Sequence, residues 1–188
     1  MRRLRRAFRR RLAPEVSKRL KFLDEAGVNR ALTRGFGRAA PGERVREGVP
    51  QNYGANLTML AAIGVRGLSA PMTIEGPVDA EVFCTYIRKV LGPTLKRGDL
   101  VVMDNLSAHK VSGVAEAIRA RRARLEYLPP YSPDFNPIEP CWSKIKTALR
   151  TTKARTRQAL EGAIAQALGT ITAADARAWF AHCGYPVH

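Results

Sequence analysis

An uninterrupted apolar run, Leu100 to Met103, lies between two acids, Asp99 and Asp104. Such a run is typical of a strand that is buried on both faces of its sheet, because a strand with one face in water alternates apolar and polar residues. A sheet buried on both faces needs helices on each side. The segment therefore predicts an α/β domain.

Strand, helix and strand follow one another from this segment onward. Helical spacing of apolar residues resumes over 112–122, and residues 125–128 predict another short strand. This order predicts a crossover connection between two parallel strands. Further helices are predicted over 79–91, 136–149, 157–168 and 173–181.

The first third of the chain predicts the antiparallel part of the sheet. Residues 57–65 and 70–74 predict a hairpin, and residues 20–23 predict a strand that ends at Asp24. Gly, Pro, Arg and Asn are frequent over 33–56, which predicts a loop or a loose edge hairpin. Together, these elements predict a mixed sheet of about five strands with helices on both faces.

Positive charge is concentrated at the start of the chain. The first 21 residues contain ten Lys and Arg and one acid, Glu15, while Leu4, Phe8 and Leu12 recur at a spacing of four. This pattern predicts a helix with a thin apolar stripe and cationic flanks. We expect residues 1–19 to form a basic arm and residues 20–188 to form a single domain.

Composition narrows the classes of partner and compartment. The 32 Lys and Arg against 16 Asp and Glu give a net charge of +16, so polyanions are the expected partners. No apolar stretch approaches the roughly 18 residues of a membrane-spanning helix. The three cysteines, Cys84, Cys141 and Cys183, are odd in number and far apart, which favours a reducing cytoplasm over a disulfide framework.

Three carboxylates are candidates for a shared site. Asp24 and Asp104 each follow a predicted strand, at the edge where open α/β sheets place their ligands. Glu139 follows Asp104 with 34 residues between them, at the start of a helix preceded by prolines. Three converging carboxylates need bound cations to offset their repulsion, and Mg²⁺ is the natural choice. Two such ions about 3.5 to 4 Å apart would activate the attacking oxygen and stabilise the leaving oxygen in phosphoryl transfer.

Alternatives remain for two of these carboxylates. Glu25 replaces Asp24 as the ligand if the strand register slips by one residue. Glu139 also fits the third position of a capping box in which Asn136 is the N-cap residue. In that case Asp134 is the substitute for the third ligand.

Several polar, aromatic and basic residues near these acids are candidates for contact with nucleic acid. Tyr131 and Trp142 either stack on a splayed base or fill core, and core is the commoner fate of aromatic residues beside a proline-rich turn. Basic residues over 144–155 lie on or just beyond the helix of Glu139, where they can follow a DNA backbone. The expected nucleic-acid contacts are Asn105, His109, Lys110, Tyr131, Lys144, Lys146 and Arg150.

Three segments carry a resemblance to a known family. Residues 22–25 (FLDE), 101–110 (VVMDNLSAHK) and 128–139 (LPPYSPDFNPIE) resemble the catalytic domain of transposases of the insertion-sequence-630 type, in the mariner superfamily. The resemblance extends from about Leu20 to Tyr185, and the proline-rich block is its most specific part.

This resemblance implies a ribonuclease-H-like fold and a DDE endonuclease site. It implies that Asp24, Asp104 and Glu139 bind two Mg²⁺ ions, for which Mn²⁺ can substitute. The implied reaction is cleavage and rejoining of DNA at transposon ends. A homodimer on DNA and a place in the bacterial cytoplasm, at the nucleoid, are also implied.

One departure from the family leaves two functional hypotheses open. Members of the family resemble two-part proteins in which helix-turn-helix domains precede the catalytic domain, whereas this chain starts with a basic arm that resembles the linker between the parts. The first hypothesis is an active, metal-dependent transposase domain. The second is a catalytically silent DNA-binding remnant of a truncated transposase.

Overall fold

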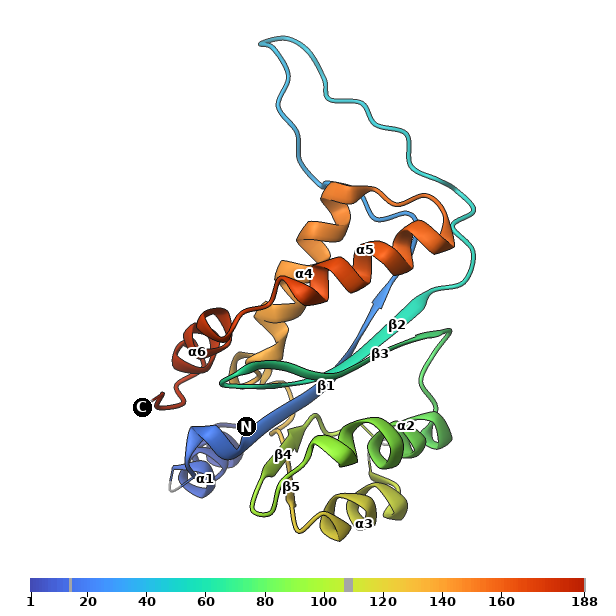
Figure 1. The fold of residues 1–188 in the computed structure, drawn as a ribbon. Coiled ribbons are helices and arrows are strands. Elements are labelled where there is room, and N and C mark those ends of the chain that lie inside the picture. The colour runs from blue at the N-terminus through green and yellow to red at the C-terminus, as the bar shows by residue number, and fades with distance from the viewer. Residues whose placement is uncertain (14, 107–109, 188) are drawn as a thin grey trace.

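A five-stranded mixed sheet with helices on both faces forms the molecule (Figure 1). The computed structural model describes residues 1–13, 15–106 and 110–187. The strand order is β3-β2-β1-β4-β5, which confirms the predicted α/β sheet of about five strands. The strands are β1 (Leu20–Val28), β2 (Leu57–Gly64), β3 (Gly67–Glu75), β4 (Leu100–Met103) and β5 (Arg124–Tyr127).

The predicted helices are confirmed, with small shifts at their ends. The α-helices are α1 (Arg2–Leu12), α2 (Ala80–Tyr86), α3 (Ser112–Ala120), α4 (Ile138–Thr152), α5 (Arg157–Gly169) and α6 (Ala173–His182). Asp79 caps α2 by accepting a hydrogen bond of 2.8 Å from the backbone N–H of Val82. This helix continues through a π-helical turn, Ile87–Leu91, into a 3₁₀ turn, Gly92–Thr94.

The predicted pairing of the strands is also confirmed. β2 and β3 form an antiparallel hairpin in which Gly64 pairs with Gly67. β4 lies parallel to both β1 and β5, and all four of its residues are buried. The apolar run of β4 is therefore explained by helices that cover both faces of the sheet.

β1 is longer than its apolar run predicts. The parallel pairing with β4 ends at Leu23 and Met103, but antiparallel pairing with β2 continues to Val28. The prediction that this strand ends at Asp24 is wrong, because β2 supplies backbone partners to residues that have no apolar pattern of their own. Asp24 is thus the first residue of β1 beyond its pairing with β4.

The two faces of the sheet bury separate hydrophobic clusters. Phe22, Ala26 and Val28 of β1 pack with apolar residues of α1, α4, α5 and α6, whereas Leu23 packs with residues of α2 and α3. Because successive side chains of a strand point to opposite faces, Asp24 lies on the face of Phe22 and Ala26. The carboxylate of Asp24 therefore lies on the side of the sheet covered by α4.

Helix α1 confirms the predicted apolar stripe in part. Phe8 and Leu12 are buried, but Leu4 is 53% exposed. The Phe8 ring stacks on Phe135, with 5.8 Å between centroids, and the Arg5 guanidinium lies 4.1 Å from the centroid of the same ring. The basic N-terminal segment is therefore packed against the proline-rich block.

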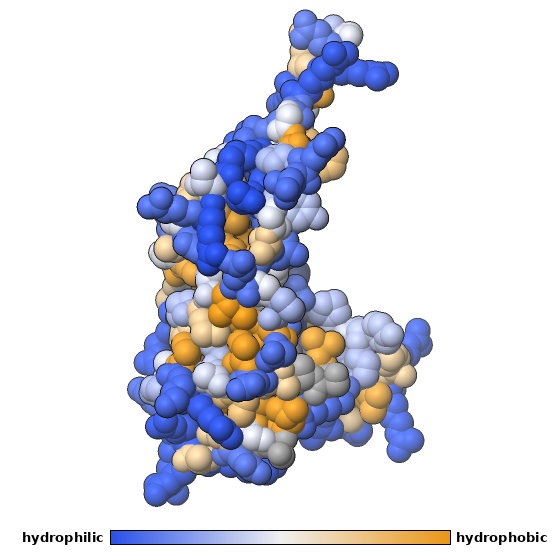
Figure 2. All heavy atoms as spheres, turned by 90° about the vertical axis from the view of Figure 1, so that its right-hand side faces the viewer, coloured by the Kyte–Doolittle hydropathy of each residue, from blue (hydrophilic) through white to orange (hydrophobic). Residues whose placement is uncertain are grey.

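The segment between β1 and β2, residues 29–56, projects from the body of the molecule (Figures 1 and 2). No helix or strand is formed along these described residues, so of the two alternatives for 33–56 the loop is confirmed and the edge hairpin is wrong. The start of this segment is held by Arg155, whose guanidinium donates hydrogen bonds to the backbone carbonyls of Arg30 (2.6 Å) and Leu32 (3.2 Å). Below this projection, apolar residues gather in the middle of the face shown in Figure 2.

Within the described ranges, every helix is too short or too polar to cross a lipid bilayer.

Candidate active site

A cavity of about 430 Å³ opens at the carboxyl edge of β4. Asp24, Asp104 and Glu139 all line it. Its walls also include Asn105, Leu106 and residues of the proline-rich segment 128–136. Three acids that are far apart in sequence therefore share one hollow.

The sheet register brings the two aspartates together. Leu23 of β1 is paired with Met103 of β4, so the next residue of each parallel strand, Asp24 or Asp104, lies at the same edge. Glu139 comes from the first turn of α4. The segment before α4 starts at β4 as well, because the backbone N–H of Leu128 donates to the carbonyl of Met103 at 2.8 Å.

The environment of Asp24 opposes ionisation. The pKa of Asp24 is raised to about 7, chiefly by burial, and the nearby charges of Glu139 and Asp104 contribute to this rise. The backbone N–H of Glu25 and the indole of Trp142 act against this rise by hydrogen bonding to the carboxylate. The three acids therefore interact electrostatically, as a shared site requires.

Trp142 provides a contact that the sequence interpretation missed. Its Nε1–H donates a hydrogen bond of 3.2 Å to Oδ2 of Asp24, across 118 residues of sequence. Its burial confirms the prediction that Trp142 fills core, with 3% of the residue exposed. The one sequence signal for the contact is that Trp142 lies three residues after Glu139, on the same face of a helix.

The competing carboxylates lie elsewhere. Glu25 does not line the cavity, because it follows Asp24 in the strand and faces the other side of the sheet. Asp134 accepts hydrogen bonds from both terminal nitrogens of Arg5, and this guanidinium holds the pKa of Asp134 below its ordinary value. Asp134 thus fastens α1 to the proline-rich segment.

The capping box predicted for Glu139 is not formed. The N-cap residue of α4 is Pro137, and no side chain caps this described helix. Asn136 contributes its backbone carbonyl, which accepts from the Glu139 N–H at 3.1 Å, while no donor among the described residues reaches its buried Oδ1. The helix starts one residue later than predicted, so Glu139 occupies the second helical position instead of the third.

The donor set fits a hard cation by its chemistry. Carboxylate oxygens are the ligands that Mg²⁺ prefers. Across the described ranges, however, no three His, Cys, Asp or Glu side chains are grouped so as to hold a metal ion. Both aspartates accept hydrogen bonds from the protein: Trp142 donates to Oδ2 of Asp24, and the backbone N–H of Leu106 donates to Oδ1 of Asp104 at 3.2 Å.

Two of the expected nucleic-acid contacts lie at the cavity. Asn105 and Tyr131 line the cavity, and Lys110 is exposed. The expectation that Tyr131 fills core is wrong, because it is 88% exposed, with a φ of 51° in the proline-rich turn. His109 lies outside the described residues.

Some of the basic residues over 144–155 have partners within the protein. Lys144 forms an ion pair of 2.8 Å with Asp175, and Lys153 forms one with Glu47. Lys146 and Arg150 are partly exposed on α4. A DNA contact by Lys144 stays a prediction, in competition with its link between α4 and α6.

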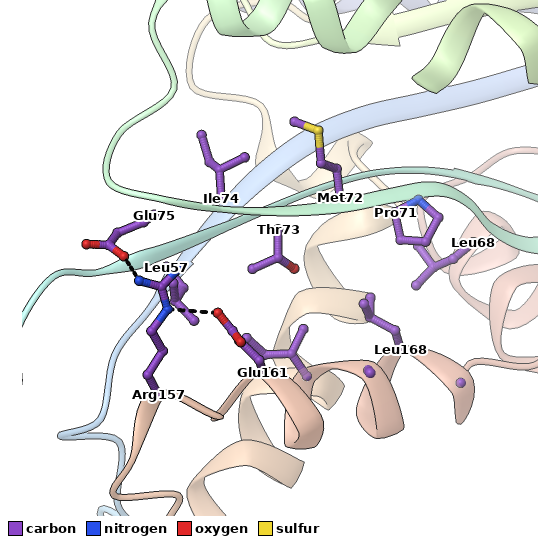
Figure 3. A pocket seen from close by; sticks show the side chains of 13 residues that line it. Leu57, Leu68, Pro71, Met72, Thr73, Ile74, Glu75, Arg157, Glu161 and Leu168 are labelled. Carbon is purple, nitrogen blue, oxygen red and sulfur yellow. Dashed lines mark hydrogen bonds and ion pairs between the residues drawn. The ribbon is translucent and has the colours of Figure 1, made fainter. Parts of the chain in front are cut away.

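A larger groove of about 610 Å³ lies between the edge strand β3 and helix α5 (Figure 3). Its lining is mostly apolar, and its two acids, Glu75 and Glu161, both pair with Arg157. These acids are neutralised within the protein. The smaller cavity at the carboxyl edge is therefore the candidate active site.

Comparison with known proteins gives a family and a fold. The family model of the DDE superfamily endonuclease matches residues 19–161. A Mos1 transposase paired-end complex with the left transposon end is 13% identical and has a TM-score of 0.75, over 94% of this chain and 56% of that one. The catalytic domain of Mos1 mariner transposase is 11% identical and has a TM-score of 0.68, over 95% of this chain and 84% of that one.

This chain therefore spans little more than half the length of the longer Mos1 chains that it matches. At such low identity, the likeness shows the fold, which is the ribonuclease-H-like fold of the Mos1 catalytic domain. The comparison with curated proteins finds no match. Because the family model covers 143 of the 188 residues, from 19 to 161, the chain belongs to the DDE superfamily endonucleases.

Proposed function

We propose that this chain is the catalytic domain of a transposase of the insertion-sequence-630 type, which cleaves and joins DNA strands at transposon ends. One observation carries the proposal. Asp24, Asp104 and Glu139 reach the same cavity from separate elements, close enough for the other two charges to raise the pKa of Asp24. The DDE endonuclease family and the Mos1-like fold support the same activity.

The three carboxylates would hold two Mg²⁺ ions, with Mn²⁺ as a substitute. When bound, the ions would activate the attacking oxygen and stabilise the leaving oxygen. The half-buried carboxylate of Asp24, in the field of two other acids, has the surroundings in which a cation offsets both burial and repulsion. Solved structures of Mos1 transposase with Mn and with Mg support this choice.

DNA is the proposed partner, as both transposon end and target. The net charge of +16 favours a polyanion, and exposed arginines of α1 lie on the element packed against the proline-rich segment. Asn105, Lys110 and Tyr131 are proposed to contact DNA near the cavity, and Lys146 and Arg150 along α4. Joining two ends needs two active sites, so we propose a homodimer on DNA, in the bacterial nucleoid.

A nicking assay on supercoiled plasmid DNA tests this proposal. We expect nicking with Mg²⁺ or Mn²⁺ and a 3′-hydroxyl product, with weaker nicking in Ca²⁺, which prefers more ligands at longer distances. Asp104→Asn and Glu139→Gln should each abolish nicking, because a neutral amide cannot replace a carboxylate on the cation. Glu116→Gln, at an exposed position of α3, is the matched control and should nick like the parent.

Two results would count against the proposal. Undiminished nicking by the Asp104→Asn protein would assign the activity to a contaminating nuclease. Binding of DNA without nicking in either metal would favour the catalytically silent remnant.

A further inference from the structure

Helix α4 sends two side chains toward the Asp24 carboxylate. Glu139 lines the cavity shared with Asp24, and Trp142 donates its indole N–H to Oδ2 of Asp24 at 3.2 Å. Residues three apart lie on one face of a helix. The helix that brings one acid of the site therefore also brings a hydrogen-bond donor to another.

The buried indole N–H of Trp142 requires a hydrogen-bond acceptor, and Asp24 provides one. Trp142 is 3% exposed, and a buried N–H without an acceptor costs free energy. Its ring packs in the hydrophobic cluster that β1 forms with α4, α5 and α6, which fixes the position of Nε1. A donor on a packed ring can hold a carboxylate in one orientation more firmly than a donor on a mobile side chain.

We propose that Trp142 is a positioning residue that sets the orientation of the Asp24 carboxylate for binding a divalent cation. This inference rests on the proposed function, because it takes Asp24 as a metal ligand. A carboxylate has about four lone-pair sites, so the hydrogen bonds from Trp142 and from the Glu25 N–H leave others available to a cation. Donors that orient a metal ligand in this way typically change metal affinity by about 10- to 100-fold when they are lost.

Core packing and positioning depend on different parts of the indole. Packing needs the ring, whereas positioning needs the N–H. Benzothienylalanine, an analogue of tryptophan with sulfur in place of the N–H, keeps the shape and removes the donor. The chain has two tryptophans, so Trp179→Phe yields a protein in which the analogue enters at position 142 alone.

The experiment measures Mn²⁺ affinity in this Trp179→Phe background, by counting free Mn²⁺ with electron paramagnetic resonance. We expect the Trp179→Phe protein to bind Mn²⁺ like the parent and to show quenching of Trp142 fluorescence on binding. The analogue should weaken Mn²⁺ affinity by about 10- to 100-fold. Asp24→Asn should remove the fluorescence response of Trp142.

Leu149→Ala provides the control for a merely structural role. Leu149 is a buried residue of the same helix and cluster as Trp142, and it does not line the cavity. Its truncation should lower the melting temperature more than the analogue does, yet weaken Mn²⁺ binding less.

Three results would overturn the inference. Unchanged Mn²⁺ affinity with the analogue would remove the positioning role and leave the triad proposal intact. If Leu149→Ala weakens Mn²⁺ binding as much as the analogue does, the role of Trp142 is core packing alone. A parent that binds no Mn²⁺ would remove the proposed function together with the inference.

Discussion

At the scale of single residues, Asp24 determines how the metal-free protein responds to pH. Its folded-state pKa of about 7 lies above the ordinary value of 3.8, so between these pH values the folded protein holds a proton that the unfolded chain releases. Stability therefore falls as pH rises through this window. The penalty at pH 8 is on the order of 4 kcal/mol.

Asp24→Asn should remove this penalty, because an amide does not ionise. With metal chelated, we expect the variant to match the parent near pH 4 and to be more stable than the parent at pH 8. Urea unfolding across this range gives the difference. Parallel stability profiles for the two proteins would show that Asp24 ionises in the fold as freely as in the unfolded chain.

Asp134→Asn is the matched control for this measurement. The pKa of Asp134 is lowered by Arg5, so its ion pair stabilises the protein above the ordinary pKa and is lost as pH falls. The variant should lose stability at pH 8 and approach the parent in acid. The two aspartates thus predict shifts of opposite sign.

The residues of the candidate site differ in how well sequence predicts them. Asp24 and Asp104 follow apolar runs, and parallel pairing brings such positions together, so their common edge was predictable. The contact between Trp142 and Asp24 was not, because it depends on how α4 packs on β1. The prediction of a capping box was wrong because the pattern of residue types does not determine whether Asn136 or Pro137 is the N-cap residue of α4.

At the scale of elements, α1 shows what a periodic pattern leaves open. The spacing of Leu4, Phe8 and Leu12 predicts a helix with an apolar stripe, and the structure has that helix. The pattern does not say what covers the stripe. The stripe is covered by Phe135, which lies 127 positions beyond Phe8. The prolines around Phe135 predict a turn, but they do not indicate which element packs against it.

Phe8→Ala should therefore destabilise the whole protein, by about 3 to 5 kcal/mol, because a fully buried ring is lost from the main cluster. Leu4→Ala is the control on the same helix, and its exposed side chain should make the change nearly neutral. Urea unfolding measures both. Equal, small effects would mean that α1 does not pack on the proline-rich segment in solution.

At the scale of the whole molecule, composition predicts an electropositive surface but not the place where DNA lies. The charge of +16 is spread over the chain, and some cations expected to face DNA, such as Lys144 and Lys153, have carboxylate partners. Which cations remain available is decided by tertiary contacts. Apart from the two arginines that lie over Phe135 and from Arg11, which pairs with Glu126, helix α1 has four exposed arginines, at positions 2, 3, 6 and 10.

These four arginines predict a local contribution to DNA binding. Each phosphate contact releases counterions, so the logarithm of affinity falls with the logarithm of salt concentration by roughly 0.9 per contact. Replacing all four by Gln should reduce the slope by roughly 3 to 4 if each contacts a phosphate. Deletion of residues 2–11 is a poorer test, because it also removes Phe8 from the core.

The matched control removes four exposed cations from the π-helical turn after α2 and from the end of α3, Arg88, Lys89, Arg119 and Arg121, and so lowers the net charge equally. Fluorescence anisotropy with a short duplex, over a range of salt concentrations and without metal, gives the slope for each protein. A smaller change in the control would place the phosphate contacts on α1. Equal changes of the slope in both variants would show that DNA affinity depends only on the net charge of the protein. An unchanged slope in both variants would show that α1 does not contact DNA.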